Sequence, residues 1–215
     1  MRYKFEEQLK ILNDELTEMG NLIESAIANA VKALEKKDLD CAKKAIAFDE
    51  EVDRKEKDIE SICLKLILHQ QPVATDLRMI SAALKMITDM ERIGDMASDI
   101  AEIAQTLGDN KYMEGITPIH DMAEATINMV NKSVDAYINK DTELAKRVVQ
   151  SDDIVDGLFD TVKNDLVALI GTDSKAGGAA LDFLMVAKYF ERIGDHATNI
   201  AEWVMFSITG GKEPE

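Results

Sequence analysis

The stretch DMERIGDMASDIAE, residues 89–102, shares the pentapeptide ERIGD with KYFERIGDHATNIAE, residues 188–202. A second block also recurs, since KDLDCAK at 37–43 returns as KDTELAK at 140–146. Residue numbers differ by 103 between the copies of this block and by 100 between the copies of ERIGD. Self-similarity at a long spacing is the signature of an internal duplication. The sequence therefore predicts two copies of one structural unit, with a shorter connection in the second copy.

Apolar residues around both copies of ERIGD recur at steps of three and four, the pattern of a helix with one buried face. The same steps occur near the N-terminus and over about residues 38–69. Asp38 and Asp141 are expected to cap helix starts, because a short side-chain acceptor bonds the free amide groups there. The expected buried rows are Met79, Ala83, Met86, Met90, Ile93, Ala97, Ile100, Ala104 and Leu107, and Phe183, Val186, Phe190, Ile193, Ala197, Ile200 and Val204.

Each copy is thus expected to hold three long helices. Only 3 prolines and 11 glycines occur in 215 residues, which favours helix over sheet. Short connections make neighbouring helices antiparallel. The predicted fold class is all-α, with two pseudo-symmetric three-helix bundles. The first unit is expected to cover residues 1–108 and the second 109–215, with the break inside LGDNKYMEGITP, residues 107–118.

The net charge of the chain limits the classes of partner that it can bind. With 41 acidic and 25 basic residues, the formal net charge is −16. This charge disfavours nucleic acid bound through a basic surface and favours cations or basic protein surfaces. Cys41 and Cys63 fall on one predicted helix, about 33 Å apart, which is beyond disulfide reach and suits a reducing cytosol. No apolar run approaches the ~20 residues of a membrane span. A cytoplasmic protein that meets a membrane only indirectly is expected.

Acidic residues four positions apart form short rows on the second and third helix of each copy. In an antiparallel hairpin, residues equally far from the turn lie level, so a turn at Pro72 and another within GTDSK, residues 171–175, would align these rows. Four carboxylates should then converge in each half. The level pairs are Asp49 with Asp95 and Asp53 with Glu91 in the first copy, and Asp152 with Asp195 and Asp156 with Glu191 in the second.

Converging carboxylates repel one another by roughly 1 kcal/mol or more, so the arrangement predicts bound cations. All the ligands are oxygen atoms, which suits Mg, Mn or Fe better than a structural zinc site. Gly94 and Gly194 are expected to let a neighbouring backbone or ligand approach closely, and Arg92 and Arg192 to pair with acids across the bundle. A solvated acidic face, kept twice by duplication alone, is the alternative. The candidate metal ligands are Asp49, Asp53, Glu91, Asp95, Asp99, Asp152, Asp156, Glu191 and Asp195.

Two three-helix repeats with these acidic pairs, doubled ERIGD, and QPVATDLR at residues 71–78 resemble the PhoU family of phosphate-uptake regulators over essentially the whole chain. The resemblance implies an accessory protein, often a homodimer, that restrains the phosphate ABC transporter through its ATPase subunit and relays its state to a sensor histidine kinase. It also implies iron or zinc clusters at the acidic pairs. The second copy departs from this pattern, with GTDSKAGG at residues 171–178 in the place of QPVATDLR.

Two other function classes remain. A di-metal carboxylate enzyme would use Glu and Glu-x-x-His ligands inside a four-helix core, but no such motif lies at the acidic rows, and no nucleophile with an aligned base is evident. The chain is therefore not expected to be an enzyme. A metal-free helical scaffold is the remaining class, and metal analysis separates it from the metal-binding adaptor.

Overall fold

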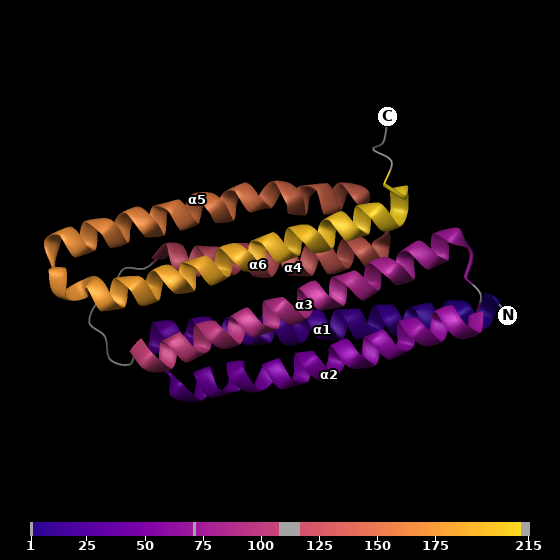
Figure 1. Ribbon diagram of the computed structural model, residues 1–215, viewed down its shortest axis with the longest axis horizontal. Helices are drawn as coiled ribbons and strands as arrows, with labels where there is room; N and C mark the ends of the chain where they lie inside the picture. The colour runs from indigo at the N-terminus through magenta and orange to yellow at the C-terminus, as the bar shows by residue number, and fades with distance from the viewer. Residues whose placement is uncertain (1, 71, 108–116, 212–215) are drawn as a thin grey trace.

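The computed structural model describes residues 2–70, 72–107 and 117–211. Six α-helices form this part of the chain, so the all-α prediction is confirmed (Figure 1). No helix among the described residues combines the length and the low charge needed to cross a bilayer. The helices are α1 (Arg2–Lys36), α2 (Leu39–Gln70), α3 (Ala74–Leu107), α4 (Thr117–Asn139), α5 (Thr142–Thr172) and α6 (Gly177–Thr209), with a short 3₁₀ turn, Ser174–Ala176, before α6.

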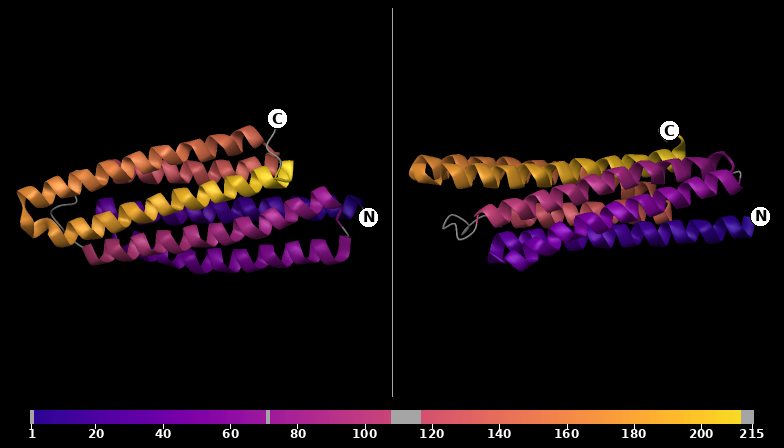
Figure 2. Two further views of the ribbon diagram at one scale, coloured as in Figure 1. Left: turned by 45° about the horizontal axis from the view of Figure 1, so that its top comes forward. Right: turned by 60° about the horizontal axis from the view of Figure 1, so that its bottom comes forward.

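The helices form two three-helix bundles that lie side by side. Helices α1, α2 and α3 pack on one another, and so do α4, α5 and α6. The bundles meet mainly where α3 packs along α6, with a smaller contact between α1 and α4. Helices α2 and α5 lie at opposite edges of the molecule in the view of Figure 1, and Figure 2 shows the same arrangement from two other directions. The predicted boundary at 108/109 lies outside the described residues.

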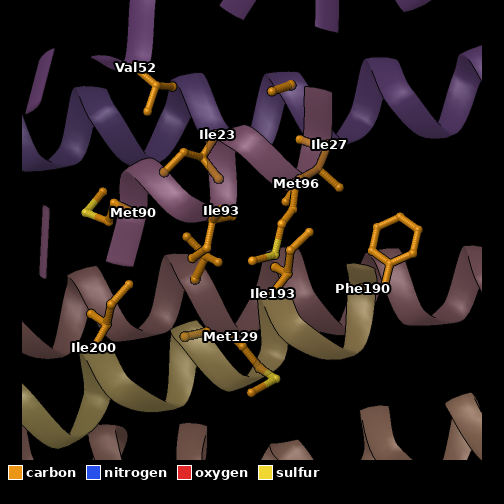
Figure 3. Close-up of a cluster of buried hydrophobic side chains, with 14 of the residues drawn as sticks. Ile23, Ile27, Val52, Met90, Ile93, Met96, Met129, Phe190, Ile193 and Ile200 are labelled. Atoms are coloured by element: carbon orange, nitrogen blue, oxygen red, sulfur yellow. The ribbon is translucent and has the colours of Figure 1, made fainter. Parts of the chain in front are cut away.

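One hydrophobic core runs through both bundles. Every residue of the two rows expected to be buried on α3 and α6 is buried. Figure 3 shows how these rows meet between the repeats, where Ile93 and Met96 from α3 lie near Ile193 from α6. The sequence predicted the rows but not this shared core, because a helical period shows which face is apolar and not which helix covers it.

Both predicted N-caps are present. The Asp38 Oδ1 atom accepts hydrogen bonds from the backbone N–H groups of Asp40 (2.9 Å) and Cys41 (3.1 Å). The Asp141 Oδ1 atom accepts one from the backbone N–H of Leu144 at 2.9 Å. The residue before each cap, Lys37 and Lys140, has a left-handed backbone with φ of 54°. The two repeats therefore use the same connection between their first and second helices.

Candidate metal site

The structure brings Asp49, Asp53 and Asp95 together. Asp49 and Asp53 lie one turn apart on α2, and Asp95 faces them from α3. Each offers one carboxylate oxygen, and these three oxygens lie within 4.8 Å of one another. The hairpin between α2 and α3 creates this proximity, because its turn near Pro72 sets Asp49 level with Asp95. We refer to Asp49, Asp53 and Asp95 as the aspartate triad.

Asp49 is the most perturbed member of the triad. Burial raises its pKa from 3.8 to about 6, with further contributions from the negative charges of Asp95 and Asp53. Its Oδ1 atom is fully shielded from solvent and has no hydrogen-bond partner among the described residues. A shielded carboxylate oxygen without a donor costs free energy unless a proton or a cation neutralises it. The triad therefore favours uptake of positive charge.

Glu91 and Asp99, the other candidates on α3, border the triad without belonging to its closest group. Burial raises the pKa of the Glu91 carboxyl, and so does the charge of Asp95. Asp99 is close enough for its charge to contribute to the raised pKa of Asp49. It also helps raise the pKa of the Tyr189 phenol on α6, where burial is the larger cause. Asp99 thus lies between the triad and the second repeat.

The ion pairs of Arg92 lie along its own helix and not across the bundle, where its positive charge reaches only as far as the electrostatic interaction with Glu56 of α2. Its Nε atom lies 3.3 Å from Glu91 Oε2, and its Nη1 atom donates to Asp95 Oδ2 at 2.8 Å. Both partners are on the same helix: Asp95 lies three positions further along and shares a face with Arg92, and the long guanidinium side chain also reaches the adjacent Glu91. Arg92 partly neutralises the edge of the triad, but its side chain is 56% exposed. Solvent screening therefore weakens this pairing.

The matching acids of the second repeat form a looser set. Burial raises the pKa of Asp152 from 3.8 to about 6, and the charges of Asp156 and Asp195 add to the shift. These acids are therefore near one another, yet they form no group as close as the triad. Lys188 Nζ lies 2.5 Å from Glu191 Oε2. The ammonium group of the half-exposed Lys188 side chain pairs with one carboxylate there, whereas the matching residue of the first repeat is Thr88.

The ERIGD glycines permit close helix contact next to both acidic sets. A Cβ atom on Gly94 would lie 3.1 Å from Cγ1 of Val52, and one on Gly194 would lie 3.1 Å from Oδ1 of Asp152. The sequence predicted a close approach at both positions. The approaching groups are side chains of the paired helix, not backbone atoms. Gly194 thereby leaves room for the carboxylate that has the most strongly shifted pKa of its set.

Two histidine contacts between the repeats were missed from the sequence. His196 Nδ1 lies 2.8 Å from Asp89 Oδ1, joining α6 to α3. His120 Nδ1 lies 2.8 Å from Glu35 Oε1, joining α4 to α1. No local spacing signals such pairs, because their partners lie in the other repeat. Only the relative placement of the two bundles reveals them.

The triad fits a metal ion by its own chemistry. Its ligand atoms are three carboxylate oxygens from two helices, and Asp49 has a shielded Oδ1 atom without a hydrogen-bond partner. Oxygen-only sites of this kind suit hard cations such as Mg²⁺ and Mn²⁺, and carboxylates also bind iron and zinc. A bound cation would relieve the repulsion that raises the pKa of Asp49.

The chain is similar in sequence to one family of known proteins. Its residues 16–104 and 119–204 each match the model of the PhoU domain. The chain is 38% identical over 207 residues to a phosphate-specific transport system accessory protein PhoU homolog of Clostridium acetobutylicum, covering 96% of this chain and 94% of the relative. A homolog of the same description from Pseudomonas aeruginosa is 33% identical, with 96% and 86% covered.

Solved structures agree with this comparison. The crystal structure of PhoU from Pseudomonas aeruginosa superposes with a TM-score of 0.89 at 33% identity, covering 96% of this chain and 99% of that one. The phosphate transport system regulatory protein PhoU from Streptococcus pneumoniae also has a TM-score of 0.89, at 23% identity, and shares the fold. Because the two domain matches cover most of the sequence and the relatives align over nearly all of it, the chain belongs to the PhoU family.

Proposed function

We propose that the chain is a regulatory accessory protein of a phosphate transport system and not an enzyme. The observation that carries this proposal is the match of both repeats to the PhoU domain, together with relatives described as phosphate-specific transport system accessory proteins that align over almost the whole chain. Regulation without chemistry also fits an all-helical fold whose acidic rows lack the Glu-x-x-His ligands of di-metal enzymes.

The aspartate triad is proposed to hold a metal ion. Support comes from the three oxygens within 4.8 Å of one another and from the shielded, unpartnered Oδ1 of Asp49. The family resemblance favours iron or zinc, whereas the all-oxygen ligands favour magnesium or manganese. Glu91 and Asp99 are proposed as additional ligands at the edge of the triad. Asp152, Asp156, Glu191 and Asp195 are proposed as a second, weaker site, since Lys188 already pairs with Glu191.

A metal ion at the triad would reverse the local electric field. In a chain with a formal charge of −16, the acidic surface repels phosphate and carboxylate groups. A bound cation with open coordination positions attracts such groups instead. The triad would then act as the binding point for a phosphate or for a carboxylate of a partner protein, and metal occupancy would control that contact.

The proposed partners are the ATPase subunit of a phosphate ABC transporter and a sensor histidine kinase. The chain is proposed to work as a homodimer in the cytoplasm and to reach the membrane only through the transporter. Nucleic acid is not a proposed partner, because 41 acidic residues against 25 basic ones oppose binding to a polyanion.

The test is capture of purified ATPase subunit and purified kinase by the immobilised chain, at high and at low phosphate. The variant D49N/D53N is compared with D58N, a matched change at an exposed aspartate of the same helix. We expect the wild type and D58N to capture at least one partner in a phosphate-dependent way, and D49N/D53N to capture less. Failure of the wild type to capture either partner at any phosphate level would overturn the adaptor function.

A further inference from the structure

Exposed apolar side chains gather at the turns of the two acidic hairpins, α2–α3 and α5–α6. The described residues include twelve exposed large apolar side chains, and eight of them lie at these two turns. Single exposed apolar residues are ordinary, whereas a group of them marks a surface that another molecule covers. The first tip patch consists of Leu64, Leu68, Val73 and Leu77, which are 42–73% exposed. The second tip patch consists of Val167, Ile170, Leu181 and Met185, which are 39–67% exposed.

Each tip patch shares a helix face with the acidic set of its own hairpin. Leu64 lies eleven residues after Asp53 on α2, which amounts to three turns and about 20°. Val167 has the same spacing from Asp156 on α5. The acids and the apolar tip therefore follow one another along the same side of each hairpin.

This side of the first hairpin points away from α1. Lys55 Nζ lies 2.8 Å from Glu15 Oε2 and 2.7 Å from Glu18 Oε2, so Lys55 faces α1. Asp53 is two positions earlier and points about 200° away from Lys55 around α2. Helices α1 and α4 both lie behind the hairpins in Figure 1. The two hairpins thus form one layer, and no helix among the described residues covers its front.

The two tip patches lie at opposite ends of this layer. Helices α3 and α6 run antiparallel (Figure 1), and the Arg78 side chain on α3 lies beside Gly210 at the end of α6. Leu77 is therefore level with the end of α6, whereas Leu181 is near its start. At 1.5 Å per residue, the helix between these two levels is about 45 Å long. The two acidic sets lie between the patches.

The surface between the tip patches is acidic on α2. Its acids there are Asp49, Asp53, Glu56 and Glu60, against one base, Lys57. Burial and the charges of Asp53 and Glu60 raise the pKa of the Glu56 carboxyl. Glu56 and Glu60 are not candidate metal ligands, so their charges remain when a metal ion fills the triad. A partner that covers this surface needs positive charge beside its apolar contacts.

We propose that the two tip patches bind the two subunits of one homodimeric partner protein. Each subunit contacts one tip patch with apolar side chains and the adjoining acidic surface with basic ones. Leu64 and Val167 occupy matching positions of the duplicated unit, 103 residues apart, so one chain presents two like half-sites. One partner surface can occupy both half-sites at once only when it is present in two copies related by a two-fold axis.

The acidic surface also argues against a second copy of this chain as the occupant. Two chains of formal charge −16 that met through this layer would bring acidic surface against acidic surface. A basic partner gains from the same charges. This inference rests on the adaptor function proposed above, and it assigns the contact surface and the symmetry of the partner.

The experiment measures binding to the purified ATPase subunit or the purified kinase, whichever the wild type captures. Light scattering should give a complex of one chain with two partner subunits. L64K and V167K should each weaken binding at least tenfold, and L64K/V167K should abolish it. The control I154K changes a side chain of α5 that is also exposed, at 59%. Ile154 lies thirteen residues before Val167, about 140° away around the helix, so I154K should bind as the wild type does.

Charge complementarity has its own readout. Binding should weaken as the salt concentration rises, because salt screens charges at an exposed contact. At low salt E60Q should bind more weakly than the wild type, and K57Q, the matched change of opposite sign, should bind more tightly. Metal content should stay the same in both variants. Affinities that depend neither on salt nor on these two changes would overturn the basic partner.

The outcomes separate the tip contact from the adaptor function. A wild type that captures neither protein overturns both. Wild-type affinity in L64K/V167K, or a complex with one partner subunit per chain, overturns the tip contact alone. A lower mass of L64K/V167K than of the wild type without partner would make a second copy the occupant. Binding of the wild type, but not of L64K/V167K, to phosphatidylcholine vesicles would make a membrane the occupant, and either result overturns the proposal.

Discussion

Asp89 on α3 and His196 on α6 lie 107 positions apart in the sequence, yet Oδ1 of one is 2.8 Å from Nδ1 of the other. The side chains are only 16% and 21% exposed. Asn199 adds a longer contact, with its Nδ2 atom donating to the same oxygen at 3.4 Å. Asp89 lies two residues before Glu91, and His196 directly follows Asp195. The pair thus joins the two repeats beside both acidic sets.

Replacing Asp89 should weaken the contact between the repeats. Hydrogen bonds to charged groups contribute about 1.5–3 kcal/mol, and partial exposure places this one at the lower end. We expect D89N to lower the free energy of unfolding by about 1–2 kcal/mol, measured by urea denaturation. A double-mutant cycle with H196Q isolates the pair. Strictly additive effects of the two changes would show that the pair contributes nothing.

The metal-free protein should become more stable as the pH falls from 7.5 toward 5. The native-state pKa values of Asp49 and Asp152 are about 6, against an ordinary 3.8. Between these values the native state binds more protons than the unfolded state, so the free energy of unfolding falls as pH rises through the window. The melting temperature of chelator-treated protein measures this.

The variant D49N/D152N separates the contribution of these two carboxyls to pH-dependent stability from that of the histidine contacts. Its amide groups do not titrate, so its melting temperature should depend less on pH than that of the wild type. It should also exceed the wild-type value at pH 7.5 in the absence of metal. Parallel pH profiles for the two proteins would contradict the assignment of the effect to these buried acids.

Replacing two helical glycines with alanine should change the free energy of unfolding in opposite directions. Gly94→Ala places a methyl group 3.1 Å from the buried Val52. Overpacking of this kind costs about 1–3 kcal/mol, which outweighs the gain in helix propensity. Gly157→Ala meets no atom within 4 Å and should stabilise the chain by up to about 1 kcal/mol. Unfolding is measured at a concentration where the chain is monomeric. A stabilising G94A would show that Val52 has room to move.

Lys140 holds a left-handed backbone at the end of α4, with φ of 54°. The backbone N–H of Asp141 bonds to the carbonyl of Ala136 at 2.9 Å and fixes this geometry. Non-glycine residues are strained there by about 1 kcal/mol, so Lys140→Gly should raise the free energy of unfolding by roughly that amount. Lys140→Ala keeps the strain and should give no gain. Equal effects of both changes would contradict the explanation by backbone strain.

Local patterns predicted much of the fold. The apolar steps on α3 and α6 predicted their buried faces, and the short acidic side chains of Asp38 and Asp141 predicted the caps. Counting from the turns predicted that Asp49 and Asp95 would meet. These features depend on residues within one helix or one hairpin, where spacing determines geometry.

Contacts between the repeats could not be predicted from such local spacing. The pairing of Asp89 with His196 depends on how α3 packs along α6, which no spacing within one helix encodes. The sequence analysis also did not predict the difference between the two acidic sets, because the duplication suggested that the two sets were equivalent. Asp152, Asp156 and Asp195 form no group as close as the triad, although they match its three members, and Lys188, at the position of Thr88, pairs with Glu191.

The most direct measurement is the metal content of protein purified without chelator, for the wild type, D49N/D53N/D95N and the control D58N. We predict at least one metal ion per wild-type chain, the same content in D58N, and loss of that ion in the triple variant. Treatment of the wild type with chelator should then lower its melting temperature, because an ion bound only to the native state stabilises it. A wild-type chain without metal, or a triple variant that keeps all of it, would contradict a metal site at Asp49, Asp53 and Asp95.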